Sequence, residues 1–157
     1  AGGAAAGVLG PLLERRPAAV LVVNRSPARA EALIARHRSL AADHGVELAA
    51  AGLEDAARQL GAAPFGLVLN ASASSVAGGP PPVAPSVLGA GAWALDLMYG
   101  RAAAPFLAWA RAHGAQAEDG LGMLVEQAAE AFWLWRGVRP RTAPVLAALR
   151  ARLESAA

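Results

Sequence analysis

Short apolar runs alternate with longer helical segments along this chain, and this alternation limits the possible folds more than any other feature. Three of the runs end in polar side chains: AAVLVVN (18–24), FGLVLNAS (65–72) and WALDLMY (93–99). Such runs are typical of strands that are buried on both faces of a parallel sheet. Weaker strand patterns cover 46–50 and 115–120.

Helical patterns fill most of the remaining sequence, apart from a turn-rich loop at 74–92. They cover 4–16, 26–42, 53–61, 104–114, 120–137 and 142–157. Alternation of this kind predicts an α/β fold with a doubly wound parallel sheet, in which ligands bind at the carboxyl ends of the strands. The polar residues expected at those ends are Asn24, Arg25, Asn70, Ser72, Asp96 and Tyr99.

The glycines in AGGAAAG stand directly before the first predicted helix. Glycines at such a turn let the backbone approach a pyrophosphate, and the helix N-terminus offers free N–H groups. Roughly 20 residues later, a predicted strand ends in NRS. At this point NAD-binding folds have an acidic residue, whereas NADP-binding folds have an Arg. Arg25 can stack on adenine and pair with a 2′-phosphate, and Arg29 lies one helical turn further on. The pattern favours NADP, with solvated surface arginines as the alternative.

Five stretches together resemble the shikimate dehydrogenase family, and DGLGMLVEQA within the last is the most specific piece. They are AGGA (1–4), NRSPARA (24–30), NASAS (70–74), DLMYGRAAAPFLAWA (96–110) and DGLGMLVEQAAEAF (119–132). The resemblance implies a Rossmann-like sheet that here lacks its first strand, so that two neighbouring strands keep unpaired edges. It divides the chain into an NADP-binding domain truncated at its N-terminus (1–118) and C-terminal helices (119–157) that pack partly on a missing substrate domain.

The resemblance also assigns roles to individual residues. It implies cofactor-binding roles for Gly2, Gly3 and Ala4 at the diphosphate, for Asn24, Arg25, Ser26 and Arg29 at the 2′-phosphate, and for Asn70, Ser72, Leu97, Met98, Gly120 and Met123 toward the ribose and nicotinamide. It implies substrate-binding roles for Tyr99 and Gln127. Gly120, Met123, Leu124 and Gln127 recur at helical spacing and are expected to share a face. If Gln127 is buried on that face, its side-chain amide needs a hydrogen-bond partner. That partner is the substrate, or else the backbone or a water molecule.

The implied activity is the reversible, NADPH-dependent reduction of 3-dehydroshikimate to shikimate. In this family the catalytic Lys and Asp belong to the substrate domain, and all 14 residues counted as Lys or Arg here are Arg. We therefore expect no catalytic residue in this chain and no activity from it alone. Two alternatives stay open: a non-catalytic NADP-binding module, and a quinate/shikimate dehydrogenase relative.

Composition excludes several other classes of protein. The chain has no Cys, which rules out disulfides, cysteine-bound zinc and thiol nucleophiles. Its three His are scattered, and we expect surface residues and no metal site. The sequence pI near 10.4 accompanies a net charge of only +2 because the bases are arginines, so it does not indicate nucleic-acid binding.

No apolar run is long enough for a membrane span. We expect a cytoplasmic protein with a small-molecule substrate, and a homodimer as a possible full-length form.

Overall fold

The computed structural model describes residues 2–56, 64–72 and 81–155. The strands are β1 (Ala19–Val23), β2 (Glu47–Ala51), β3 (Phe65–Asn70), β4 (Leu88–Asp96) and β5 (Gln116–Glu118). The helices are α1 (Gly3–Glu14), α2 (Pro27–Ala35), α3 (Arg38–Asp43), α5 (Ala104–Ala112), α6 (Leu121–Arg136) and α7 (Thr142–Ser155), with 3-10 turns η2 (Pro85–Val87) and η3 (Gly100–Ala102). The α/β class with parallel strands is confirmed.

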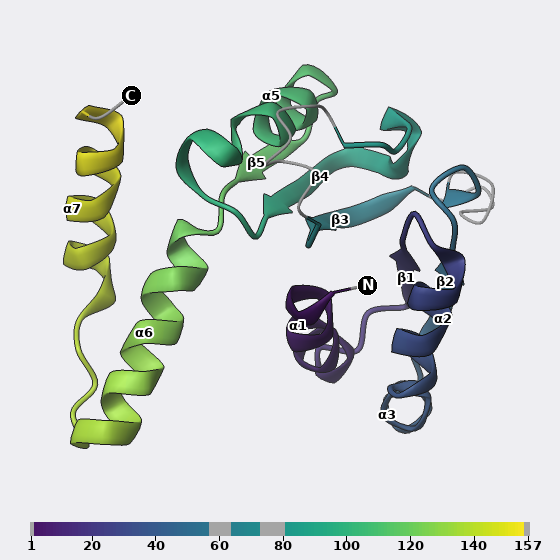
Figure 1. The fold of residues 1–157 in the computed structure, drawn as a ribbon, viewed down its shortest axis with the longest axis horizontal. Helices are drawn as coiled ribbons and strands as arrows, with labels where there is room; N and C mark the ends of the chain where they lie inside the picture. Colours follow the sequence, from purple (N-terminus) through teal and green to yellow (C-terminus); the bar gives the residue numbers. More distant parts are fainter. Residues whose placement is uncertain (1, 57–63, 73–80, 156–157) are drawn as a thin grey trace.

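The strands form two separate parallel sheets (Figure 1). One has the order β1–β2 and the other β3–β4–β5. Among the described residues β1 pairs only with β2, and β3 pairs only with β4. Each of β1 and β3 therefore has one edge that is unpaired among the described residues. In one continuous sheet, these two edges would each lie beside a further strand, as the sequence led us to expect.

Each sheet has its own hydrophobic core, formed together with neighbouring helices. In the first, Leu9 and Leu13 of α1 meet Leu33 of α2, and Ala41 and Val46 complete the cluster. In the second, Phe106 and Ala110 of α5 pack on small residues of the sheet, Ala92 and Ala94 of β4 and Ala115 before β5. The small Ala side chains let α5 approach closely, and Phe106 fills the space that they leave.

The predicted helix over 26–42 is two helices, α2 and α3. His37 lies at the break, where its backbone N–H donates to the carbonyl of Ile34, three residues back. Its ring Nδ1 lies 3.0 Å from the carbonyl oxygen of Leu33. The ring occupies a carbonyl that an unbroken helix would offer to a backbone N–H, so a local side-chain contact competes with helix continuation.

The prediction of loop at 88–92 is wrong, because β4 already begins at Leu88. These residues are Gly- and Ala-rich and carry little strand propensity. Tertiary pairing decides instead: Leu88 is in register with Phe65, and a Cβ on Gly89 would lie 3.0 Å from the Phe65 carbonyl oxygen. Residues 74–80 of the predicted loop, and residues 57–61 of the helix predicted at 53–61, lie outside the described residues.

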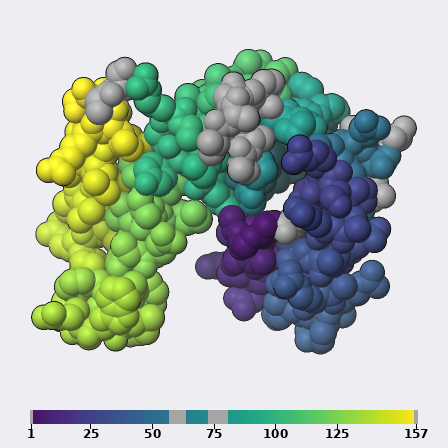
Figure 2. All heavy atoms as spheres, in the orientation of Figure 1, coloured from purple at the N-terminus to yellow at the C-terminus, as the bar shows by residue number. Residues whose placement is uncertain are grey.

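The helices α6 and α7 form an antiparallel pair beside the second sheet (Figure 1). Figure 2 shows this pair as an arm, green to yellow, with an open notch between it and the purple α1. The predicted helices 120–137 and 142–157 are confirmed as α6 and α7. None of the helices among the described residues is both long and apolar enough to cross a membrane.

Candidate functional site

The first part of the candidate site is the N-terminus of α1. Gly2 is its N-cap, and the Gly2 carbonyl accepts a hydrogen bond from the N–H of Ala6 at 3.1 Å. Gly2, Gly3 and Ala4 are exposed, and a Cβ on either glycine would meet no atom within 4 Å. Packing inside the chain therefore does not require glycine here, while the first-turn N–H groups have no acceptor within the helix.

The second part is the loop that follows β1. Its shape comes from Asn24, whose side-chain Oδ1 accepts a hydrogen bond from the Ser26 N–H at 3.0 Å. Ser26 is the N-cap of α2, with Pro27 in the first turn as predicted. Arg25 and Pro27 line a hollow of about 250 Å³, and Arg29 is exposed one turn into α2.

The opposite wall of that hollow was not predicted. It is formed by Gly52, Leu53, Glu54 and Asp55, which follow β2. The available signal was the parallel pairing of two predicted strands: Val23 is in register with Ala51, and the Asn24 N–H donates to the Ala51 carbonyl. The residues after both strands consequently face each other.

The third part is a hydrogen-bond network at the carboxyl ends of β3 and β4. Asp96 is fully buried, and one of its carboxylate oxygens accepts from the Asn70 side-chain amide at 3.0 Å. The other accepts from the Met98 N–H at 2.9 Å. Asn70 Oδ1 in turn accepts from the Ser72 N–H and hydroxyl. The network fixes the backbone of the two loops that carry Ser72 and Met98, because a buried carboxylate needs these partners.

The fourth part is the junction between β5 and α6. Gly120 donates its N–H to the Met98 carbonyl at 2.8 Å. A Cβ on Gly120 would lie 2.4 Å from the carbonyl oxygen of Leu97, so no larger residue fits without a shift of the backbone. The segment after β4 and the start of α6 are thus held in direct contact, which brings the predicted residues Leu97, Met98 and Gly120 together.

A cluster around Asp119 fixes the same junction and was missed as a site feature. Asp119 is buried, and its carboxylate accepts from the N–H groups of Gly100 (2.9 Å) and Leu121 (3.2 Å). Arg150 of α7 donates to both carboxylate oxygens, each at 2.8 Å. Burial favours a raised pKa for Asp119, but the hydrogen bonds from Arg150, Gly100 and Leu121 hold its pKa below the ordinary value of 3.8.

The predicted substrate-side residues lie on open surface. The expectation that Gln127 is buried is wrong: its side chain is exposed, like that of Met123. Both lie on the face of α6 opposite the buried Leu121, Val125 and Ala129. Tyr99, directly before Gly100, is also exposed.

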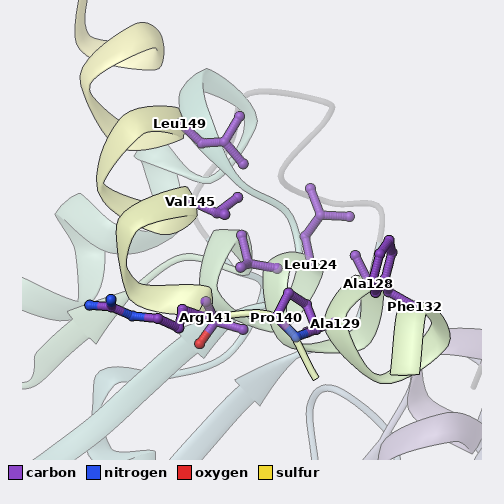
Figure 3. A pocket seen from close by; sticks show the side chains of 10 residues that line it. Leu124, Ala128, Ala129, Phe132, Pro140, Arg141, Val145 and Leu149 are labelled. Atoms are coloured by element: carbon purple, nitrogen blue, oxygen red, sulfur yellow. The ribbon is translucent and has the colours of Figure 1, made fainter. Parts of the chain in front are cut away.

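Leu124, another residue of the predicted shared face, is less exposed than Met123 and Gln127. It lines an apolar groove of about 250 Å³ between α6 and α7, together with Phe132, Val145 and Leu149 (Figure 3). None of the predicted cofactor or substrate residues lines that groove.

The aromatic residues near the end of α6 differ in their surroundings. Phe132 lines the groove beside α7, and the guanidinium of Arg139 lies 5.8 Å from the ring centroid of Trp133. Trp135 is 80% exposed. In residues 2–56, 64–72 and 81–155, no group of three or more His, Asp or Glu side chains is placed to hold a metal ion.

Taken together, parallel strands, a glycine at the start of α1 and polar loops at the strand ends define a Rossmann-like α/β protein. The sequence model of the Shikimate 5'-dehydrogenase C-terminal domain matches residues 120–150. The chain is 60% identical over its whole length to Shikimate dehydrogenase (NADP(+)) of Acidovorax ebreus, of which it covers 54%. Over its whole length the chain is thus similar to part of a shikimate dehydrogenase, and it spans about half the length of this curated relative.

Solved structures agree with this fold. A shikimate dehydrogenase in complex with NADP⁺ aligns over 98% of this chain and 52% of its own, with a TM-score of 0.68 and 27% identity. Quinate dehydrogenase from Corynebacterium glutamicum in complex with NAD aligns over 96% of this chain and 52% of its own, with a TM-score of 0.76. At 24% identity this second likeness shows the fold alone.

Proposed function

We propose that this chain is the NADP-binding part of a shikimate dehydrogenase, an oxidoreductase that interconverts shikimate and 3-dehydroshikimate. The 60% identity along the whole chain to an enzyme of that name is the observation that carries the proposal. The chain spans only 54% of that enzyme, so the catalytic acid/base chemistry would fall to residues outside this chain. Proton transfer at the reacting oxygen needs a positioned acid/base group, and the family's Lys has no counterpart among the 14 basic residues here, all Arg.

The residues present fit a dinucleotide with a 2′-phosphate. The open N-terminus of α1 at Gly2, Gly3 and Ala4 suits a diphosphate, since it offers N–H groups and no side chain beyond Cβ. The Arg25 side of the hollow suits an adenosine 2′-phosphate, with Arg29 one helical turn further on and Asn24 and Ser26 shaping the loop, whereas Glu54 and Asp55 on the opposite wall would repel a phosphate placed against them. When bound, the cofactor supplies or accepts the hydride.

The network at the ends of β3 and β4 is proposed to form the other half of the cofactor site. Asn70 and Ser72 would face the ribose, and Leu97, Met98, Gly120 and Met123 the nicotinamide. The support is the hydrogen bonding that holds these loops in one arrangement, through Asp96 and through the Gly120 contact with Met98. Such preorganisation lets a site orient a reactive ring without ordering its own backbone first.

Tyr99 and Gln127 are proposed to bind the substrate. Both side chains are exposed, next to the segments that Gly120 and Asp119 hold together. A phenol hydroxyl and a carboxamide can each donate and accept, as recognition of a polyhydroxylated ring requires.

Residues 119–157 are proposed to pack partly on the portion of the enzyme that this chain does not span. The α6–α7 arm supports this, because Leu134, Trp135 and Val138 are exposed on it, between 61% and 80%. Exposed apolar surface of this kind marks an interface. The cytoplasmic location and a homodimer of the whole enzyme stay predictions.

Exchange of Arg25 tests the proposed cofactor. The chain would be joined to the part of the Acidovorax ebreus relative that it does not match, which gives a full-length chimera. In this chimera, Arg25→Ala should raise the Kd for NADP⁺ roughly 10- to 100-fold, since a hydrogen bond to a charged group contributes about 1.5–3 kcal/mol. The Kd for NAD⁺, which has no 2′-phosphate, should change less than about twofold.

Arg36→Ala is the matched control, because Arg36 is exposed at the end of α2 and does not line the hollow. Equal losses for NADP⁺ and NAD⁺ in Arg25→Ala, or equal affinities in the unsubstituted chimera, would contradict the assignment. Quinate in place of shikimate, with the same chimera, tests the alternative substrate. Binding of NADP⁺ without any turnover would favour the non-catalytic module.

A further inference from the structure

Asp119 connects three separate elements through one carboxylate. Oδ2 accepts from the Gly100 N–H of η3 and from Nη1 of Arg150 in α7. Oδ1 accepts from the Leu121 N–H at the start of α6 and from Nη2 of Arg150. With four donors on two oxygens, the carboxylate has one orientation that satisfies all of its partners.

Two of those partners adjoin the proposed site. Gly100 directly follows Tyr99, and Leu121 directly follows Gly120 and begins the helix that carries Met123 and Gln127. The Asp119 carboxylate therefore sets the spacing between the Tyr99 loop and the first turn of α6. The Gly120–Met98 hydrogen bond is a second connection between the same two segments.

Arg150 is the counter-charge of this carboxylate. The Asp119 side chain is only 3% exposed, and a buried carboxylate that loses its charged partner is strongly unfavourable. The bidentate geometry also fixes the plane of the carboxylate, which one amide contact on each oxygen does not do. Arg150 itself is 42% exposed and touches neither Tyr99 nor Gln127 in any hydrogen bond found among the described residues.

We infer that Arg150 is a positioning residue: acting through Asp119, it holds the Tyr99 loop and the first turn of α6 at the separation that substrate binding needs. The inference rests on the proposed function, since Tyr99 and Gln127 enter it as substrate ligands. It also gives α7 a role in the site, although that helix contributes no residue that would contact substrate.

The test compares Arg150→Met and Arg150→Lys with Arg152→Ala in the chimera. Met keeps the apolar stem of Arg150, Lys keeps the charge without the bidentate contact, and Arg152 is an exposed arginine on the same helix. We expect kcat/KM for shikimate to fall about tenfold in Arg150→Met and less in Arg150→Lys, with less than a twofold change in Arg152→Ala.

Two further readouts separate positioning from general loss of structure. The Kd for 2′,5′-ADP, which carries only the adenosine half of NADP, should stay within about twofold in every variant. Hydrogen exchange of the Gly100 and Leu121 amides should be faster in Arg150→Met than in the unsubstituted protein.

Equal losses for shikimate and 2′,5′-ADP would overturn the inference, as would unchanged exchange at Gly100 or unchanged kcat/KM for shikimate. Failure of the proposed function looks different: the unsubstituted chimera would then show no shikimate-dependent turnover at all.

Discussion

At the scale of single residues, Gly120 illustrates how little room the candidate site leaves. Its φ is −75°, which any residue can adopt, so the requirement for glycine is one of space. A Cβ would lie 2.4 Å from the Leu97 carbonyl oxygen and 2.8 Å from the carbonyl carbon. Both are backbone atoms, which cannot turn aside as a flexible side chain can.

Gly120→Ala is accordingly expected to lower the free energy of unfolding by roughly 1–3 kcal/mol, the usual range for overpacking. Gly122→Ala is the matched control, because a Cβ there meets no atom within 4 Å and Ala favours the helix by up to about 1 kcal/mol. Urea unfolding of the chimera measures both. If Gly120→Ala and Gly122→Ala change the free energy of unfolding by the same amount and in the same direction, the Leu97 contact does not constrain position 120.

Sequence reasoning located several of these residues but not their connections. Asn70 and Asp96 were predicted at strand ends, and parallel register places them as neighbours. Arg150 was not predicted, because its partner Asp119 is 31 residues away and only the placement of α7 brings the two together. The exposure of Gln127 was missed as well, since helical periodicity defines a face but not what covers it.

At the scale of elements, α7 is tied to the end of β5 by the Asp119–Arg150 ion pair, and this connection has a pH dependence. The pKa of Asp119 is held below its ordinary value in the folded chain, so the pair stabilises the fold above the unfolded-state pKa of about 4. That stability is lost as the pH falls through the lower, folded-state pKa.

We expect the Tm of the unsubstituted chimera to exceed that of Arg150→Met by a constant amount above about pH 5, and the gap to narrow below about pH 4. In the variant the hydrogen bonds from Arg150 no longer lower the pKa of Asp119, so protonation of that carboxyl costs the variant less stability than it costs the unsubstituted chimera. Thermal unfolding followed by circular dichroism between pH 3 and 7 measures the gap. A gap that stays the same at pH 3 would contradict this account.

Most element boundaries could be predicted because local signals coincide with them. Gly137 ends α6 in the left-handed conformation, with φ of 69°, and Pro27 opens α2. The first half of β4 could not be predicted: its Gly- and Ala-rich residues become strand only by pairing with Phe65 and its neighbours. The break at His37 likewise depends on one side-chain contact with Leu33.

At the scale of the whole molecule, the main feature is the division into two sheets with separate cores. The α/β class and the parallel pairing of the strands follow from the alternation of apolar runs and helices. The placement of the sheets relative to one another does not, because no predicted strand connects β1 to β3. Unpaired strand edges and the exposed Trp135 together predict marginal stability and association.

The chain alone is therefore expected to aggregate or to unfold without one cooperative transition, while the chimera should unfold cooperatively. The physical reason is that β1 and β3 each have an unpaired edge among the described residues and that apolar side chains of the α6–α7 arm are exposed, surfaces that the proposed full-length enzyme would cover. Calorimetry combined with sedimentation measures both properties. A soluble monomer of the chain alone with a single sharp transition would refute this expectation.

The measurement that tests the central claim most directly is the initial rate of NADP⁺ reduction by the chimera with shikimate as substrate. The part of the Acidovorax ebreus relative used to build it, assayed alone, provides the baseline. The account predicts shikimate-dependent turnover that is absent from this baseline and much faster with NADP⁺ than with NAD⁺. A folded chimera that binds neither dinucleotide, or that binds NADP⁺ but never oxidises shikimate, would contradict it.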